Sequence, residues 1–108
     1  MKEQKRERTA EVLRHLAAEF VRNESTDASL ITITRVEVSP SGKVATIYLT
    51  TLPDDQQETA EKFLVRKTPE FKRYARDHSK IGILPRLDFK IDFGERNRQR
   101  LDELSEEE

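Results

Sequence analysis

The chain has 108 residues, of which 34% are hydrophobic and 38% charged, and it contains no cysteine. This length suits one domain with a small core, and the lack of cysteine excludes disulfides, thiolate nucleophiles and cysteine-based metal sites. No window approaches the roughly 20 apolar residues of a membrane span. Residues 1–8 also lack the apolar stretch of a secretory signal, so we expect a cytoplasmic protein.

The formal net charge of −1 conceals an uneven distribution. Residues 101–108 hold five acidic side chains and no basic one, which leaves 20 basic and 16 acidic side chains in residues 1–100. The interval from Arg66 to Arg86 holds seven basic side chains against two acidic ones. Such a zone favours a polyanionic partner met through one face; a solvated helix surface is the alternative.

The first half of the chain predicts a helix followed by two strands. Apolar residues at three- and four-residue steps predict a helix from Lys5 to Glu24. The β-branched segment from Leu30 to Ser39 predicts a strand, in which the alternation changes phase near Thr34–Arg35. Either a bulge lies there or both faces are partly covered. A turn at residues 39–42 then leads into an antiparallel strand over residues 43–51.

Two helices separated by a break are predicted next. Asp55 and Glu58 resemble a capping box at the start of the first helix. This helix should stop near Lys67, because Pro69 disfavours helical geometry at the residue before it. Thr68 can then cap a second helix with Pro69 at its first position. Apolar and aromatic residues at helical spacing follow, namely Phe71, Tyr74, Ala75 and His78.

The last strand alternates Leu87, Phe89, Ile91 and Phe93 with a solvated ladder of Asp88, Lys90 and Asp92. The resulting α-β-β-α-α-β order predicts an α+β fold, a two-layer sandwich with a three-stranded sheet and helices on one face. We expect one domain over residues 1–94. Residues 95–108 are expected to form a frayed helix or an acidic tail.

Catalytic and metal-binding arrangements are not evident in the sequence. No nucleophile elbow, zinc-protease motif or phosphate-binding loop is present. Asp88 and Asp92 would lie about 13 Å apart on one strand, farther than paired glycosidase carboxylates. His15 and His78 have no acidic or nucleophilic residue at a spacing that would indicate catalysis. We therefore expect no enzymatic activity, no cofactor, no metal site and no small-molecule substrate.

The strongest functional pattern is cationic. Lys72, Arg76 and Lys80 are spaced four residues apart, and Arg73 lies beside them, so one helix face would be basic. A phosphate backbone suits such a face, and shape recognition of structured RNA fits better than base stacking. The candidate RNA-binding residues are Lys72, Arg73, Arg76 and Lys80, then Arg66, Lys67 and Arg86, and finally Arg6, Arg8, Arg35 and Lys43. The alternative is an α+β protein-interaction module that takes a partner strand at the open face of the sheet or at an exposed edge.

With this order established, the sequence resembles the ribosome-binding factor A family. The resemblance covers residues 5–104 and rests on an ordered set of segments: Arg6-x-Arg8, Ile31 to Pro40, Lys43 to Leu49, Arg73, Leu84-Pro85-x-Leu87-x-Phe89-x-x-Asp92, and Arg100-Leu101-x-x-Leu104. Two positions depart from the family pattern. Thr68-Pro69 stands where the family bends its paired helices at a small residue followed by glycine, and Arg86 stands where it usually has glutamate.

The resemblance implies a type II KH-like fold that lacks the Gly-x-x-Gly phosphate loop. It also implies binding to the small ribosomal subunit and its rRNA, with a role in late 16S rRNA processing, ribosome biogenesis and cold adaptation. The expected partner is thus the 30S subunit or its precursor, and neither a membrane nor a small molecule. We expect the protein itself to be a monomer.

Overall fold

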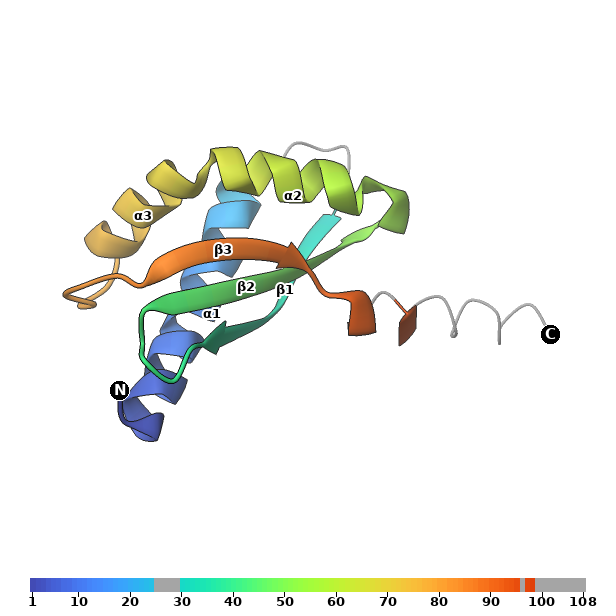
Figure 1. The fold of residues 1–108 in the computed structure, drawn as a ribbon. Helices are drawn as coiled ribbons and strands as arrows, with labels where there is room; N and C mark the ends of the chain where they lie inside the picture. Colours follow the sequence, from blue (N-terminus) through green and yellow to red (C-terminus); the bar gives the residue numbers. More distant parts are fainter. Residues whose placement is uncertain (25–29, 96, 99–108) are drawn as a thin grey trace.

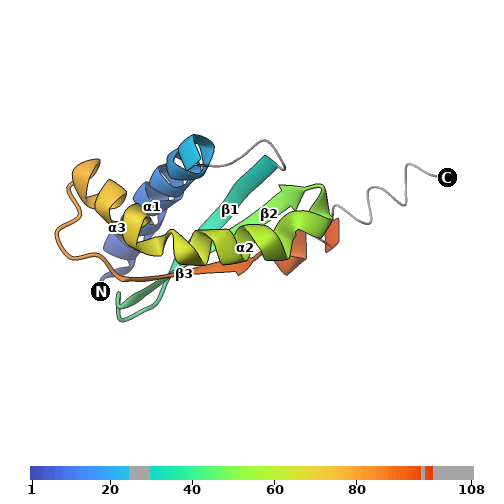
Figure 2. The ribbon, with the colours of Figure 1, turned by 90° about the horizontal axis from the view of Figure 1, so that it is seen from above.

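The structure is a computed structural model, and it describes residues 1–24, 30–95 and 97–98. Three helices lie on one side of a three-stranded sheet, as Figures 1 and 2 show from two directions. The predicted α+β sandwich and its element order are confirmed. The elements are α1 (Glu3–Glu24), β1 (Leu30–Val38), β2 (Val44–Leu52), the short 3-10 helix η1 (Asp54–Gln56), α2 (Gln57–Arg66), α3 (Thr68–Asp77) and β3 (Arg86–Ile91).

The sheet is mixed, with strand order β1-β2-β3. β1 pairs antiparallel with β2, as predicted from the short turn between them, whereas β3 pairs parallel with β2. A parallel neighbour needs a long crossover connection, and α2 and α3 provide it. The register of β1 shifts between Ile33 and Arg35, so of the two alternatives for the phase change in β1, the structure has the bulge.

The turn between β1 and β2 forms as its sequence predicts. Gly42 has a φ of 76°, a left-handed conformation that glycine adopts without steric cost. The Gly42 N–H donates to the Ser39 carbonyl at 2.8 Å, and the Ser39 N–H donates to the Val44 carbonyl at 2.8 Å.

The core lies between the helices and the inner face of the sheet. Ala45, Ile47 and Leu49 of β2 are fully buried against it. Phe71 of α3 is also fully buried, and its ring lies 5.2 Å from Phe20 of α1 and 5.9 Å from Phe89 of β3, measured between centroids. One aromatic side chain therefore joins both layers and fixes how α3 sits on the sheet.

α2 ends at Arg66 with Lys67 as its C-cap, which confirms the predicted stop near Lys67, but the starts of both paired helices differ from the prediction. The capping box is wrong: η1 precedes α2, and the cap residue is Gln56, which makes no side-chain capping bond. Thr68 is the first residue of α3 and not its cap; its hydroxyl donates to the Leu64 carbonyl at 3.1 Å. The break itself is at Lys67, two residues before Pro69. Pro69 explains this position, because it has no N–H to continue the helical ladder and its ring crowds the preceding turn.

The end of β3 also corrects the prediction. The strand stops at Ile91, and Phe93 lies beyond it with 60% of its surface exposed. Asp92, expected in a solvated ladder, is buried, because the β1 bulge turns polar groups toward it. Residues 93–95 and 97–98 are helical; most of the predicted tail, 95–108, lies outside the described residues. Within the described part, no helix is long and apolar enough to cross a membrane.

Candidate nucleic-acid interface

α3 presents two faces of opposite character. Phe71 and Ala75 are fully buried against the core, while Arg73 and Arg76 are exposed and Lys72 is partly exposed. None of these three cations forms an ion pair with another residue of the described part. The sequence predicts the basic face, and the structure shows that the charges of these three residues have no ion-pair partner in the described part. We call the basic side chains Lys72, Arg73, Arg76 and Lys80 the α3 ridge.

Lys80 belongs to the ridge by position but not by helical spacing. α3 ends at Asp77, so the predicted four-residue stripe stops at Arg76 and Lys80 lies in the loop that follows. The loop is held at its start by Ser79, whose hydroxyl donates to the Ala75 carbonyl at 2.6 Å. This bond satisfies a carbonyl at the helix end and keeps Lys80 next to α3. Lys80 is exposed and has no ion pair in the described residues.

The two cations at the α2–α3 junction differ in their surroundings. Arg66 is exposed and has no ion pair among the described residues. The Lys67 ammonium lies 3.2 Å from a carboxylate oxygen of Glu70 and 3.7 Å from one of Glu24. It also lies 5.7 Å from the centroid of the Phe63 ring. Lys67 thus ties α1, α2 and α3 together, and less of its charge is available to a ligand.

Arg86 is the first residue of β3 and borders a groove. Its guanidinium Nε lies 3.3 Å from Oδ1 of Asp88, although 75% of the side chain is exposed. A groove of about 340 Å³ separates β3 from the α2–α3 junction, and Val65 and Thr68 line it with Arg86 and Asp88. Arg86 therefore lies beside the junction that Arg66 and Lys67 flank, but it is already neutralised in part.

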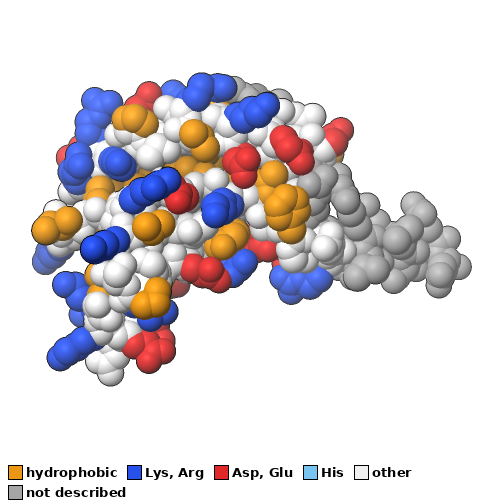
Figure 3. Space-filling view, viewed as in Figure 1, with side chains coloured by type: hydrophobic (Ala, Val, Ile, Leu, Met, Phe, Trp, Pro, Cys, Tyr) orange, Lys and Arg blue, Asp and Glu red, His pale blue; other side chains and the backbone are white. Residues whose placement is uncertain are grey.

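Space-filling representation shows how the charges gather. In Figure 3, Lys and Arg concentrate on the left of the view, over α3, the loop after it and the first turns of α1. Most of the visible Asp and Glu side chains lie toward the middle and right of the same view. The cationic end carries interspersed hydrophobic side chains, so it is not a purely polar surface.

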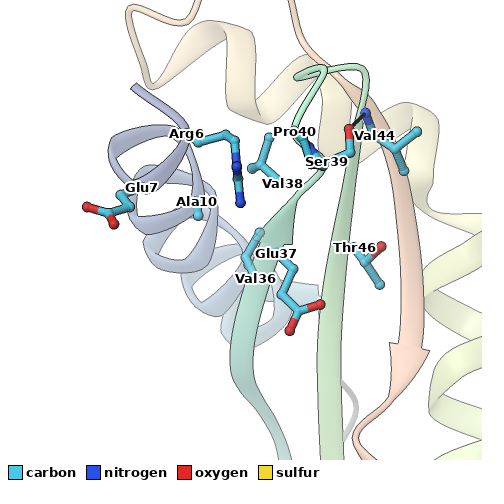
Figure 4. A pocket seen from close by; sticks show the side chains of 10 residues that line it. All are labelled: Arg6, Glu7, Ala10, Val36, Glu37, Val38, Ser39, Pro40, Val44 and Thr46. Carbon is cyan, nitrogen blue, oxygen red and sulfur yellow. Dashed lines mark hydrogen bonds between the residues drawn. The ribbon is translucent and has the colours of Figure 1, made fainter. Parts of the chain in front are cut away.

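The weaker candidates are scattered. Arg8, on α1, and Lys43, on the β1–β2 turn, are both exposed. Arg6 points into a groove of about 550 Å³ between α1 and β1, and Glu7, on the same helix, points away (Figure 4). Glu37 lies on the β1 side of that groove. Arg6 therefore faces a groove that the ridge residues do not line and whose lining includes the acidic Glu37.

Arg35 is engaged within the protein. Its guanidinium Nε lies 3.3 Å from Oδ2 of Asp92, and it also pairs with Glu37. The guanidinium lies over the Tyr48 ring, 3.9 Å from the centroid, so this face of the tyrosine is covered and closed to base stacking. Burial by itself lowers the pKa of Arg35, but the nearby Glu37 and Asp92 carboxylates raise it overall. The arrangement stabilises the β1 bulge.

The histidines serve local contacts. His15 Nε2 lies 3.1 Å from a Glu11 carboxylate oxygen on the exposed side of α1. The His78 ring stacks on Tyr74, 4.1 Å between centroids, and the Tyr74 hydroxyl donates to Glu19 at 2.9 Å. The described residues contain no cluster of three or more side chains suited to hold a metal ion.

One exposed side chain at the cationic end was not predicted. Ile83 is 94% exposed, and the sequence around it, between Gly82 and Pro85, indicates only a loop. No periodic pattern marks a single apolar residue in a loop as exposed or buried, so sequence reasoning had no signal for it.

Comparison with known proteins relates this fold and surface to a family. The sequence model described as ribosome-binding factor A matches residues 5–105. The crystal structure of ribosome-binding factor A from Thermus thermophilus is 22% identical and has a TM-score of 0.69, covering 80% of this chain and 94% of that chain. The solution structure of a Thermotoga maritima protein, proposed to be a ribosome-binding factor A, is 17% identical with a TM-score of 0.59, covering 81% and 82%.

Among curated protein sequences, none matches the chain significantly. The two solved structures support the expected type II KH-like α+β fold, in which paired helices cross between two sheet strands. The family match extends over nearly the whole chain, from the third residue of α1 to beyond β3. The protein therefore belongs to the ribosome-binding factor A family.

Proposed function

We propose that this protein is a non-enzymatic assembly factor of the small ribosomal subunit, which binds rRNA of the pre-30S particle through the α3 ridge. It acts in the cytoplasm as a monomer during late 16S rRNA maturation. Membership of the ribosome-binding factor A family supports a ribosomal partner. The observation that carries the RNA site is the set of four ridge cations without ion pairs among the described residues.

The ridge suits a phosphate backbone for two reasons. Lys72, Arg73 and Arg76 project from a helix whose opposite face is anchored by Phe71 and Ala75, and the Ser79 hydrogen bond holds the start of the loop that carries Lys80. Their backbone positions are therefore fixed before RNA arrives. Cations that are not already paired release counterions from RNA when they bind, which gives affinity without reading bases. Recognition by shape and phosphate contacts is the usual way in which proteins bind structured RNA.

The mechanism that follows is positional. The domain docks on an immature rRNA arrangement, holds it while neighbouring elements form, and leaves when the mature arrangement no longer fits the ridge. No acid–base pair or nucleophile is needed for this task. The basic residues differ in how far nearby carboxylates neutralise them, and this ranks their expected contributions to RNA binding. The ridge and Arg66 come first. Lys67 and Arg86 follow, because Glu70 and Asp88 partly neutralise them.

The test is charge reversal of the ridge. A variant with Lys72→Glu, Arg76→Glu and Lys80→Glu should stay folded, lose co-sedimentation with small subunits, and show a shallower dependence of RNA affinity on salt. The matched control reverses three exposed cations outside α3 and the loop after it: Lys62→Glu, Lys90→Glu and Arg98→Glu. It has the same net charge and should bind much as the wild type does. Equal subunit binding by the wild type and the ridge variant would refute the proposed site.

A protein-interaction module is the second candidate, and the groove in Figure 4 favours it. β1 is an edge strand of the sheet, and the groove of about 550 Å³ runs between it and α1. Val36 and Val38 line it together with Pro40, which would suit an apolar partner segment added at the edge. The dependence of binding affinity on salt concentration distinguishes the two functions. Affinity for RNA falls steeply with salt, whereas an apolar contact in this groove would change little.

A further inference from the structure

A groove of about 580 Å³ lies at the cationic end of the molecule, where three segments far apart in the chain meet. The start of α1 contributes Lys5 and Thr9, the β1–β2 turn contributes Gly42, and the loop after α3 contributes Lys80 and Ile83. We call this the end groove. Its size lies within the usual range for sites that hold a small molecule or a single residue of a polymer.

The charges of the end groove are of one sign. Lys5 and Lys80 are exposed and form no ion pair with the described residues, and no carboxylate lines the groove. Three other grooves on the described surface each include at least one: Glu7 and Glu37, Asp88, or Glu19. The end groove thus favours an anionic occupant. Lys80 is also the last cation of the α3 ridge, so a phosphate chain that follows the ridge arrives at this groove.

The walls of the end groove are largely apolar. Ile83 is 94% exposed, whereas its loop neighbours Ile81 and Leu84 pack against the core and Pro85 is buried. The loop is therefore held in place by these neighbours, and Ile83 takes no part in that packing. An aliphatic side chain held in solvent beside two free lysines fits a ligand that has an apolar flat part and negative charges on either side of it.

We propose that the end groove receives one unpaired nucleotide of the bound rRNA, with its base against Ile83 and its flanking phosphates at Lys5 and Lys80. The inference rests on the proposed function, because RNA must first reach the ridge. In a helix, bases are stacked and paired and their flat faces are hidden, so only a bulged or single-stranded nucleotide can enter. Stacking of a base is tolerant of its identity. The groove therefore selects unpaired over paired RNA, irrespective of sequence.

The experiment uses two RNA hairpins with the same stem, one fully paired and one with a single bulged 2-aminopurine. The wild-type protein should bind the bulged hairpin at least fivefold more tightly, and the 2-aminopurine fluorescence should change on binding. Ile83→Ser should reduce this preference to about one while affinity for the paired hairpin stays the same. Ile83→Trp should increase it, because an indole stacks on a base better than an aliphatic chain. Lys5→Gln should weaken binding of the bulged hairpin only. It should also lower the salt dependence of that affinity by about one phosphate contact.

The matched control is Leu52→Ser, which also replaces an exposed aliphatic residue, 53% exposed, at the end of β2 away from the groove. It should leave the preference intact. A wild type that binds small subunits and both hairpins equally well refutes the end groove but leaves the proposed function standing. A wild type that binds neither hairpin nor small subunits refutes the proposed function itself. If Ile83→Ser lowers subunit binding without altering the hairpin preference, a protein occupies the groove and the inference is wrong.

Discussion

The Thr34 hydroxyl donates a 2.6 Å hydrogen bond to Oδ2 of Asp92, joining the bulge of β1 to the residue that follows β3. Asp92 also accepts the Glu95 N–H at 3.1 Å and lies 3.3 Å from Nε of Arg35. Its own N–H donates to the Leu49 carbonyl at 2.8 Å. Asp92 therefore connects all three strands, through its carboxylate to β1 and through its main-chain N–H to β2, and its carboxylate begins the short helical turn after β3.

Replacing Asp92 tests the contribution of this carboxylate to stability. Asp92→Ala leaves the Thr34 hydroxyl and the Glu95 N–H without their acceptor, so the free energy of unfolding should fall by about 1–3 kcal/mol. Asp88→Ala is the control, because Asp88 lies on the outer sheet face and pairs with the exposed Arg86. It should change stability by less than about 0.5 kcal/mol. Urea denaturation measures both, and equal midpoints would contradict the assigned role.

The same carboxylate predicts an acid dependence. Burial by itself raises the pKa of Asp92, but the hydrogen bonds from Thr34 and Glu95 and the Arg35 charge outweigh it, and the pKa is lowered. A carboxyl whose pKa is lower in the folded state stabilises the fold at pH values above its pKa in the unfolded chain, which is about 3.9. This stabilisation is lost as the pH falls through the pKa of the folded state.

The difference in unfolding free energy between wild type and Asp92→Asn should therefore be constant from about pH 5 to about pH 7. It should shrink as the pH falls below about 4, because the wild-type carboxylate then becomes protonated. Urea denaturation at several pH values measures this difference. A difference that stays unchanged down to about pH 2 would show that the ionised carboxylate does not stabilise the fold.

Gln57 is fully buried at the first turn of α2, and neither its Oε1 nor its Nε2 has a hydrogen-bond partner among the described residues. A buried amide without partners costs free energy that an apolar side chain of similar shape avoids. Gln57→Met should therefore raise the unfolding free energy by about 1–2 kcal/mol. Gln56→Met is the control: Gln56 is only half-buried and should change stability by less than about 0.5 kcal/mol. A less stable Gln57→Met protein would argue against the prediction.

The two loop glycines should respond differently to alanine. Gly42 has a φ of 76°, where a Cβ is strained by about 1–2 kcal/mol, and an added Cβ would lie 2.6 Å from Cε of Met1. Gly82 has no positive φ, and nothing lies within 4 Å of a Cβ built there. Gly42→Ala should lower the melting temperature by several degrees, and Gly82→Ala should leave it the same or slightly higher. Thermal unfolding followed by circular dichroism distinguishes the two.

Arg66 and Lys67 are adjacent in sequence but should contribute unequally to RNA binding. Arg66 is free of ion pairs in the described part, and Lys67 is shared between Glu24 and Glu70. Arg66→Ala should lower the salt slope of RNA binding by about one contact, and Lys67→Ala should lower it by less. Lys67→Ala should instead reduce stability, by up to about 1 kcal/mol, because it joins α1 to the paired helices. Equal salt slopes for the two variants would show that the intramolecular pairs do not decide which cation reaches RNA.

Local sequence signals determined the elements of this protein. The apolar spacing from Leu13 to Phe20 predicted the buried face of α1, and the phase change near Thr34 allowed a bulge in β1. Pro69 predicted the break between α2 and α3 near Lys67, and the break is at Lys67. Each of these features depends on neighbours within a few residues, because a backbone break, a turn or a helical face is set by local sterics and spacing. The basic face that carries Arg73 and Arg76 was also visible, since it lies opposite an apolar face on the same helix.

Only the tertiary structure decided which distant groups meet. The parallel pairing of β3 with β2, the burial of Asp92 under a bulge 58 residues earlier, and the pairing of Arg35 each depend on contacts between remote segments. The same holds for the end groove, which Lys5 and Ile83 both line. The sequence states which side chains are polar and which are apolar. Their exposure and their partners depend on what the fold packs against them.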